Sequence, residues 1–189
     1  MRILGVDPGL TRCGVAVIEV SDTRALRLVD VRVIQTSPSM NLANRVLAIK
    51  TGLVLALNEL KPDRVALERV FAQHNLRTVM GTAQASGVVL AEAAERGLSI
   101  DLHTPSEVKA AVTGNGRANK VQVANMVKKL LSMPDDKLLP DATDALALAI
   151  CNAWRGGAGS LVSAENNEDG LTLAQQKWRE AERLSRRRG

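Results

Sequence analysis

The stretch "RILGVDPGLTRCGVAVIEV", residues 2–20, decides the fold of this chain. Its two ends are short apolar runs rich in Val and Ile, and a turn containing Pro and Gly separates them. This pattern predicts an antiparallel pair of strands. One carboxylate, Asp7, stands at the end of the first run, where a charge requires an explanation.

The residues that follow alternate between strand and helix patterns. A third strand extends the antiparallel pair, and the later strands read as parallel to the first. Three hairpin strands followed by strand-helix units predict an α/β fold with a mixed five-stranded sheet and helices on both faces. The expected elements after the opening pair are a strand at 25–35, a helix at 41–60, a strand at 65–68, a helix at 74–96, a strand at 98–103, and helices opening at 104, within 118–131 and at 139–154.

Length and composition predict one compact domain with a tail. The 189 residues are 46% hydrophobic, which is enough for a single core. We expect that domain over residues 1–156, a flexible linker over 157–170, and a basic tail, helical or disordered, over 171–189. The formal charge of +5 is compatible with a polyanionic partner, although modest basicity is weak evidence for one.

Several classes of protein are disfavoured by the sequence. It has no apolar run of 18 residues and no basic segment followed by a cleavage site, so we expect no membrane span, no signal peptide and a cytoplasmic location. Cys13 and Cys151 are far apart and lack CxxC spacing, which argues against a thiolate metal site or a disulfide framework. We expect both thiols to be buried as small hydrophobic groups.

Four carboxylates are candidates for one site. Asp7 and Glu68 each end an apolar strand, and the carboxyl ends of neighbouring parallel strands meet at one edge of a sheet. Asp141 and Asp144 are three residues apart at the start of a helix, so they share a face. A structural explanation is the alternative to a functional site. Each strand-end acid could simply mark where its strand leaves the core and meets water, and Asp141 could cap its helix.

Asp144 is harder to explain structurally. Its helix continues as "ALALAIC", which is apolar on every side, and a carboxylate that faces a core needs a partner. No cluster of buried Lys or Arg is evident near these acids, and four carboxylates without a cation would repel one another. A divalent metal resolves the repulsion, and hard oxygen ligands favour Mg²⁺ or Mn²⁺ over zinc. Two such ions form the usual clamp for phosphodiester hydrolysis, and Gly9 would let a ligand approach the backbone.

Four blocks of the sequence, in their order and spacing, resemble the RuvC family of Holliday junction resolvases, which have the ribonuclease H-like fold. The blocks are "GVDPGLTRCGVAVIE", "ALERVF", "HTPSEVKAAVTGNGRANKVQV" and "DATDALALAI", and the resemblance spans residues 1 to about 156. It implies that the family's acidic ligands fall on Asp7, Glu68, Asp141 and Asp144. Some members have histidine at the third position, so the resemblance here implies an all-carboxylate site.

The resemblance also implies an activity and partners. The expected activity is a structure-selective endonuclease that nicks four-way DNA junctions symmetrically in recombination and repair, leaving 5′-phosphate and 3′-hydroxyl ends. Two Mg²⁺ ions per site are implied, with Mn²⁺ as a substitute, together with a homodimer and the RuvA–RuvB branch-migration complex. The uncharged helix at 79–91 contains many small residues, so it fits either a dimer contact, which the resemblance favours, or the core of one subunit.

Basic and aromatic residues are candidates for binding DNA. Residues 106–129 hold five basic side chains and one acid, which by itself fits a solvated helix face equally well. The resemblance assigns Lys109 and Lys120 to the junction near the cut phosphate, and the glycines before the helix at Lys120 suggest free N–H groups for a phosphate. Arg117 is a further candidate. Phe71 either packs in the core, the default for an aromatic after a strand, or stacks on bases as in the family.

Three other functions remain as alternatives. Ribonuclease H-like enzymes that trim ribosomal RNA precursors share the opening motif, but their chains are shorter. Actin-like ATPases share the Asp-x-Gly turn, but they need a second large domain, and this chain has no GxxxxGK phosphate loop. A junction-binding protein without catalysis would be favoured if one of the four acids were missing. The base preference at the cut, the dimer geometry and the role of the tail are not predicted.

Overall fold

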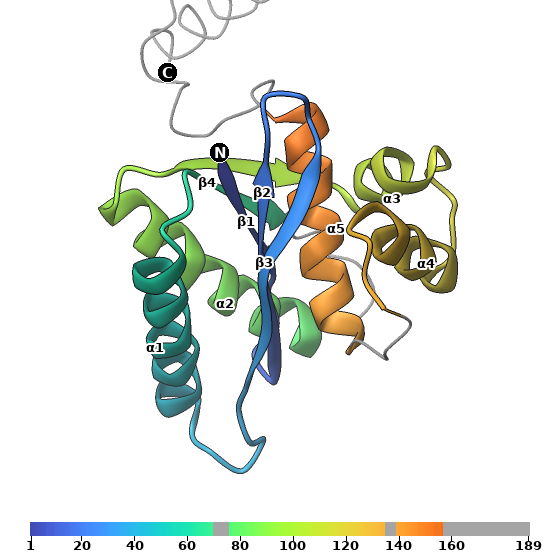
Figure 1. The fold of residues 1–189 in the computed structure, drawn as a ribbon. Helices are drawn as coiled ribbons and strands as arrows, with labels where there is room; N and C mark the ends of the chain where they lie inside the picture. Colours follow the sequence, from blue (N-terminus) through green and yellow to red (C-terminus); the bar gives the residue numbers. More distant parts are fainter. Residues whose placement is uncertain (70–75, 135–138, 157–189) are drawn as a thin grey trace, which may run out of the picture.

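The computed structural model describes residues 1–69, 76–134 and 139–156, and Figure 1 shows their fold. Five strands form one mixed sheet in the order β3-β2-β1-β4-β5, which confirms the expected fold class. The strands are β1 (Arg2–Asp7), β2 (Arg12–Val20), β3 (Leu26–Gln35), β4 (Arg64–Glu68) and β5 (Ser99–His103). The helices are α1 (Leu42–Leu60), α2 (Leu76–Glu95), α3 (Pro105–Thr113), α4 (Lys120–Leu130) and α5 (Pro140–Arg155).

The opening hairpin organises the sheet. β1 and β2 pair antiparallel, β3 pairs antiparallel with β2, and β4 and β5 continue the sheet parallel to β1. The carboxyl ends of β1 and β4 therefore lie at the same edge, as the sequence predicts. The start of α2 expected at residue 74 lies outside the described residues, and the other expected elements are found with ends shifted by a few residues.

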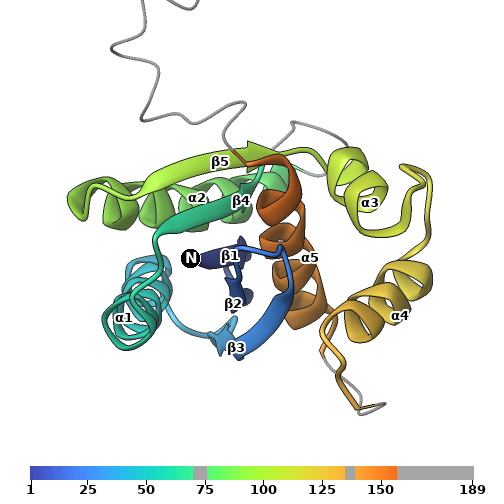
Figure 2. The same ribbon diagram turned by 45° about the horizontal axis from the view of Figure 1, so that its top comes forward.

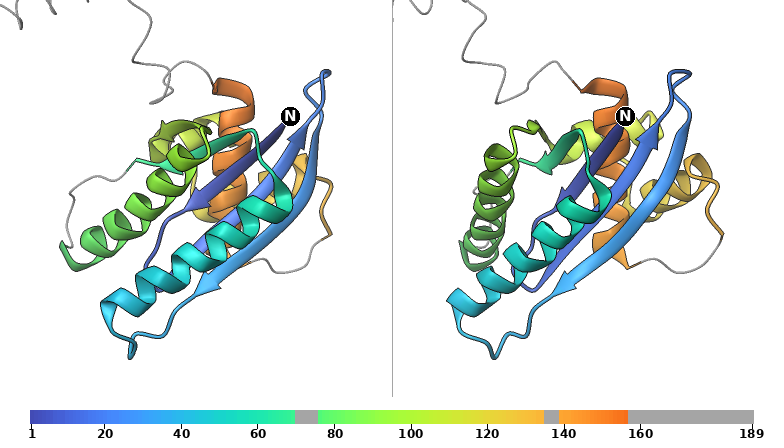
Figure 3. Two further views of the ribbon diagram at one scale, coloured as in Figure 1. Left: turned by 90° about the vertical axis from the view of Figure 1, so that its left-hand side faces the viewer. Right: turned by 60° about the vertical axis from the view of Figure 1, so that its left-hand side comes forward.

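Helices cover both faces of the sheet, as Figures 2 and 3 show. On one face α1 and α2 pack on alternate residues of the strands, around Leu4, Val17 and Leu53. On the other face α5 crosses β1 and β2, and α3 and α4 pack outside it, around Ile3, Ala145 and others. Strand side chains alternate between faces, so one short strand serves both cores.

Two glycines determine how closely α5 lies on the sheet. A Cβ on Gly5 would collide with the backbone of Ala145 and Ala149, and one on Gly14 would collide with the carbonyl of Asp141. The helix backbone therefore rests directly on β1 and β2, with no side chain between them at these points. This contact brings the first turn of α5 next to the end of β1.

The expectation for the two cysteines is confirmed, and Gly9 has a steric reason of its own. Cys13 and Cys151 are free and buried, and burial raises the pKa of both thiols. Trp154 packs against the core on the α5 face. Gly9 is required by the turn itself, because a Cβ there would meet the carbonyl of Arg12, and the approach of a ligand to its backbone stays a prediction. None of the helices in the described ranges is long and apolar enough to cross a membrane.

Candidate active site

Asp7 and Glu68 stand side by side at the carboxyl edge of the sheet. Val6 and Leu67 are paired in the parallel β1–β4 ladder, and Asp7 and Glu68 are the residues that follow them. Gly5 faces α5, and strand side chains alternate, so Asp7, two residues further on, faces α5 as well. The strand-end prediction is therefore correct in its geometry.

The first turns of α5 supply the other two carboxylates. Pro140 opens the helix, with its fixed φ and missing N–H suited to that position. The cap residue is Leu139, which makes no side-chain capping bond, so the interpretation of Asp141 as the helix cap is wrong. Asp141 and Asp144 instead line the same hollow as the strand-end acids.

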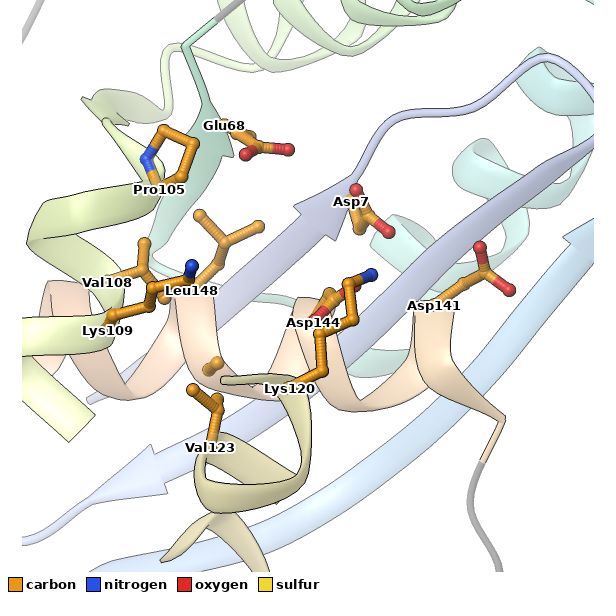
Figure 4. Close-up of a pocket in the computed structure, with 11 residues that line it drawn as sticks. Asp7, Glu68, Pro105, Val108, Lys109, Lys120, Val123, Asp141, Asp144 and Leu148 are labelled. Atoms are coloured by element: carbon orange, nitrogen blue, oxygen red, sulfur yellow. The ribbon is translucent and has the colours of Figure 1, made fainter. Parts of the chain in front are cut away.

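This hollow has a volume of about 320 Å³ and lies between the sheet edge, α5 and the two outer helices. Figure 4 shows carboxylates entering it from β1, β4 and α5, and lysines entering it from α3 and α4. We call it the carboxylate hollow. The charged residues that line it are Asp7, Glu68, Asp141, Asp144, Lys109 and Lys120.

Burial and mutual repulsion change the proton affinity of the two strand-end acids. Burial is the main cause that raises the pKa of Asp7 to about 7, and the charge of Asp144 is the next cause. Glu68 and Asp141 raise the Asp7 pKa further, whereas Lys120 lowers it. Burial and then Asp144 also raise the pKa of Glu68. Without a bound cation, this group of acids is therefore electrostatically strained.

Two exposed cations pair with the acids of α5, although the sequence shows no sign of a buried basic cluster near them. Lys120 Nζ lies 3.1 Å from Asp144 Oδ2, and Arg12 Nε lies 2.9 Å from Asp141 Oδ2. These side chains are 78% and 57% exposed, so they reach in from the surface rather than from the core. The hydrogen bond to Asp144 is the main cause that raises the pKa of Lys120.

The four carboxylates fit a divalent cation, although they do not form a closed coordination shell. In the part of the chain that the structure describes, no group of three His, Cys, Asp or Glu side chains is arranged to hold a metal ion. Asp141 Oδ2 is nevertheless buried and has no hydrogen-bond partner among the described residues, because its contact with Arg12 lacks hydrogen-bond geometry. A buried anionic oxygen that has an ion pair but no hydrogen bond, beside three other carboxylates, suits a hard cation.

The candidate DNA-binding residues have different outcomes. Lys109 and Lys120 line the carboxylate hollow, whereas Arg117 is exposed in the turn between α3 and α4 and does not line it. Phe71 lies outside the described residues, so both interpretations of it stay open. The expected free N–H groups at the start of α4 are only partly available, because its capping box uses the N–H groups of Asn119 and Gln122.

Sequence reasoning missed two arginines beside the site, Arg12 and Arg45. Arg12 had a signal, since it is a charge directly before the apolar run 13–18, as Asp7 is a charge directly after the apolar run of β1. Arg45 had none, because a polar residue in the first turns of a surface helix is ordinary. Its position beside the β1–β2 turn is a consequence of tertiary packing.

A mixed sheet of this strand order, with carboxylates gathered from two strand ends and a crossing helix, defines the class: a nuclease of the ribonuclease H-like fold. The sequence profile described as "Crossover junction endodeoxyribonuclease RuvC" matches residues 3–152. The chain belongs to the RuvC family of crossover junction endodeoxyribonucleases, and membership implies the use of a divalent metal.

Individual relatives agree with this assignment. The crossover junction endodeoxyribonuclease RuvC of Leifsonia xyli subsp. xyli is 52% identical, over 99% of this chain and 94% of its own. This similarity includes the tail, which we expected to lie outside it. Thermus thermophilus RuvC, solved in complex with a Holliday junction substrate, is 32% identical with a TM-score of 0.77, covering 82% of this chain and 93% of its own.

A more distant structure shares the fold alone. The Holliday junction resolvase of fowlpox virus superimposes with a TM-score of 0.56 at 13% identity, covering 82% of this chain and 99% of its own.

Proposed function

We propose that the protein resolves four-way DNA junctions by hydrolysing one phosphodiester bond in each of two opposed strands, in homologous recombination and repair. The observation that carries this proposal is the convergence of Asp7, Glu68, Asp141 and Asp144 on one hollow at the carboxyl edge of the sheet. The Thermus relative solved with a junction supports the choice of substrate.

The four carboxylates would hold two Mg²⁺ ions, for which Mn²⁺ can substitute. When bound, the ions activate water and stabilise the leaving oxygen. The charges of Glu68, Asp141 and Asp144 all raise the pKa of Asp7, so all four acids are close enough together to contribute to holding the ions. Lys120 and Lys109 place positive charge on the wall of the hollow, where they would attract and orient the phosphate to be cut. The products would carry 5′-phosphate and 3′-hydroxyl ends.

A homodimer fits this function, because a four-way junction is close to two-fold symmetric and needs two equivalent sites. α2 remains our candidate for the dimer contact. One face of α2, which includes Ala85, Val89 and Ala93, is buried against the core of the subunit, while Met80 is 58% exposed. We also propose the RuvA–RuvB complex as a partner, a cytoplasmic location, and a nuclease domain over residues 1–156 followed by a linker and tail.

The decisive experiment compares a labelled four-way junction with a matched linear duplex, in Mg²⁺, Mn²⁺ or Ca²⁺. We expect paired nicks on the junction alone, in Mg²⁺ or Mn²⁺, and their loss in Asp7→Asn with junction binding retained. Glu19→Gln, which changes an acid at the opposite end of the same hairpin, is the matched control and should cut normally. Binding without cleavage in any metal would indicate a structural junction-binding protein instead.

A further inference from the structure

A second hollow adjoins the carboxylate hollow. Its volume is about 530 Å³, and Asp141 forms part of the wall of both. The β1–β2 turn, α1 and α2 enclose it, and the residues that matter here are Thr11, Arg12, Arg45, Thr82 and Asp141. We call it the arginine hollow.

Arg45 is the basic group of this hollow that has no acidic partner. Its Nη2 donates to Thr11 Oγ1 at 2.7 Å and its Nε donates to Thr36 Oγ1 at 3.0 Å. Both acceptors are neutral hydroxyls, and no ion pair involves Arg45 among the residues that the structure describes. Of the five N–H groups of a guanidinium, three therefore have no hydrogen-bond partner there.

Thr36 holds the Arg45 side chain in a fixed position. Thr36 is buried, with 7% of its surface exposed. Its hydroxyl donates a hydrogen bond to the carbonyl of Leu10 and accepts one from Arg45. This chain of bonds ties the guanidinium to the β1–β2 turn, which also carries Asp7 at its start. Arg45 is thus held in place with most of its hydrogen-bonding capacity unused.

The two hollows carry opposite charge. Four carboxylates and two lysines line the carboxylate hollow, whereas two arginines and one carboxylate line the arginine hollow. A guanidinium with free N–H groups beside threonine hydroxyls matches the geometry of a phosphate oxygen pair. The neighbouring hollow is the place of the reaction, so a phosphate bound here belongs to the same strand of DNA.

We infer that the arginine hollow binds a backbone phosphate of the cut strand, next to the phosphate that is hydrolysed, with Arg45 as its principal contact. This inference rests on the proposed function and adds a second anchor point to it. One phosphate in the carboxylate hollow and a second in the arginine hollow would lie on the two sides of Asp141. Together they would fix the register of the strand without any contact that reads its bases.

The test is the affinity of an uncut junction, measured in Ca²⁺ at several salt concentrations. We expect Arg45→Gln to weaken binding about tenfold and to reduce the slope of log K against log salt by about 0.9 for each arginine hollow that meets a phosphate. Arg45→Lys should retain most of the salt slope because the charge remains. Arg27→Gln, at the far end of β3 from this site, is the matched control and should leave both quantities unchanged.

A second variant covers the case in which Arg45→Gln fails to fold. Thr82→Asp places a negative charge in the arginine hollow without removing the bonds of Arg45, and it should weaken binding by a similar factor. Unchanged affinity and salt slope in these variants, with a wild-type protein that binds and cuts junctions, would overturn the inference alone. A wild-type protein that neither binds nor cuts junctions would overturn the proposed function itself.

Discussion

Asp7 should destabilise the metal-free protein at neutral pH. Its pKa of about 7 in the folded state exceeds that of an ordinary carboxyl, so the folded protein binds this proton more tightly than the unfolded chain. Stability is therefore lost as the pH rises from about 4 to about 7, and the loss is complete above that range. Asp7→Asn removes the ionisation and should raise the melting temperature at pH 8 in EDTA by about 3 °C or more.

The pH dependence of this gain distinguishes the electrostatic explanation from others. At pH 4 the carboxyl is protonated in the folded protein, so the variant should melt close to the wild type. Glu19→Gln should show no gain at pH 8, because Arg27 lowers the pKa of Glu19 and its charge is favourable where it lies. A gain of equal size at both pH values would mean that Asn improves packing instead.

At the same scale, the sequence located the acids but not their partners. Asp7 and Glu68 were visible because a charge at the end of an apolar strand is a local anomaly. The ion pairs Arg12–Asp141 and Lys120–Asp144 were not, since each joins residues that only the packing of α4 and β2 against α5 brings together. Lys120, at the start of a helix, carries no local sign of such a contact, and Arg12 is conspicuous at the start of its strand without any sign of which acid it meets.

Among the helices, α3 shows what local sequence can predict in full. The pattern from Thr104 to Glu107 predicts a capping box, and the structure has both of its bonds. Thr104→Ala should cost about 1 kcal/mol and lower the melting temperature by about 2–4 °C. Cleavage at 25 °C should stay within about twofold, since α3 also packs on α5 and so keeps Lys109 in the hollow.

A turn threonine provides the comparison for this variant. Thr23→Ala removes a hydroxyl that bonds Ser21 on the exposed surface, and it should leave the melting temperature within about 1 °C. Equal losses in the two variants would show that the capping box contributes nothing particular. A large fall in cleavage by Thr104→Ala at full folding would place α3 in the chemistry more directly than we propose.

For the molecule as a whole, protons and metal ions should compete for one site. Asp7 must be ionised to bind a cation, and with a pKa of about 7 only about a tenth of it is ionised at pH 6. Apparent affinity for Mg²⁺ should therefore fall as the pH drops below about 7, and cleavage at limiting Mg²⁺ should fall with it. Titrating the cleavage rate with Mg²⁺ at pH 6 and pH 8 checks this.

Excess Mg²⁺ should restore most of the rate at pH 6, because mass action displaces the proton. A rate that stays low at saturating Mg²⁺ would indicate a different titrating group, and an Mg²⁺ affinity equal at both pH values would contradict the account of Asp7.

The arrangement of the whole fold followed from the order of its parts. Hairpin strands and then strand-helix units leave few ways to build one sheet, and parallel strands bring their carboxyl ends to one edge. The close approach of α5 to that sheet could not be predicted from the sequence, because Gly5 and Gly14 look like ordinary small residues in strands. Their structural role depends on which helix packs over them, and no local pattern in the sequence indicates that helix.

The glycine contacts of α5 have a consequence for mutational scanning. Any larger residue at Gly5 or Gly14 would push the helix outward and carry Asp141 and Asp144 away from the strand-end acids. In a survey scored by junction cutting alone, both positions would therefore be as intolerant as the acids, and they would be mistaken for catalytic residues. Paired measurement of protein abundance would separate the two groups, since only the glycine variants should be depleted from cells.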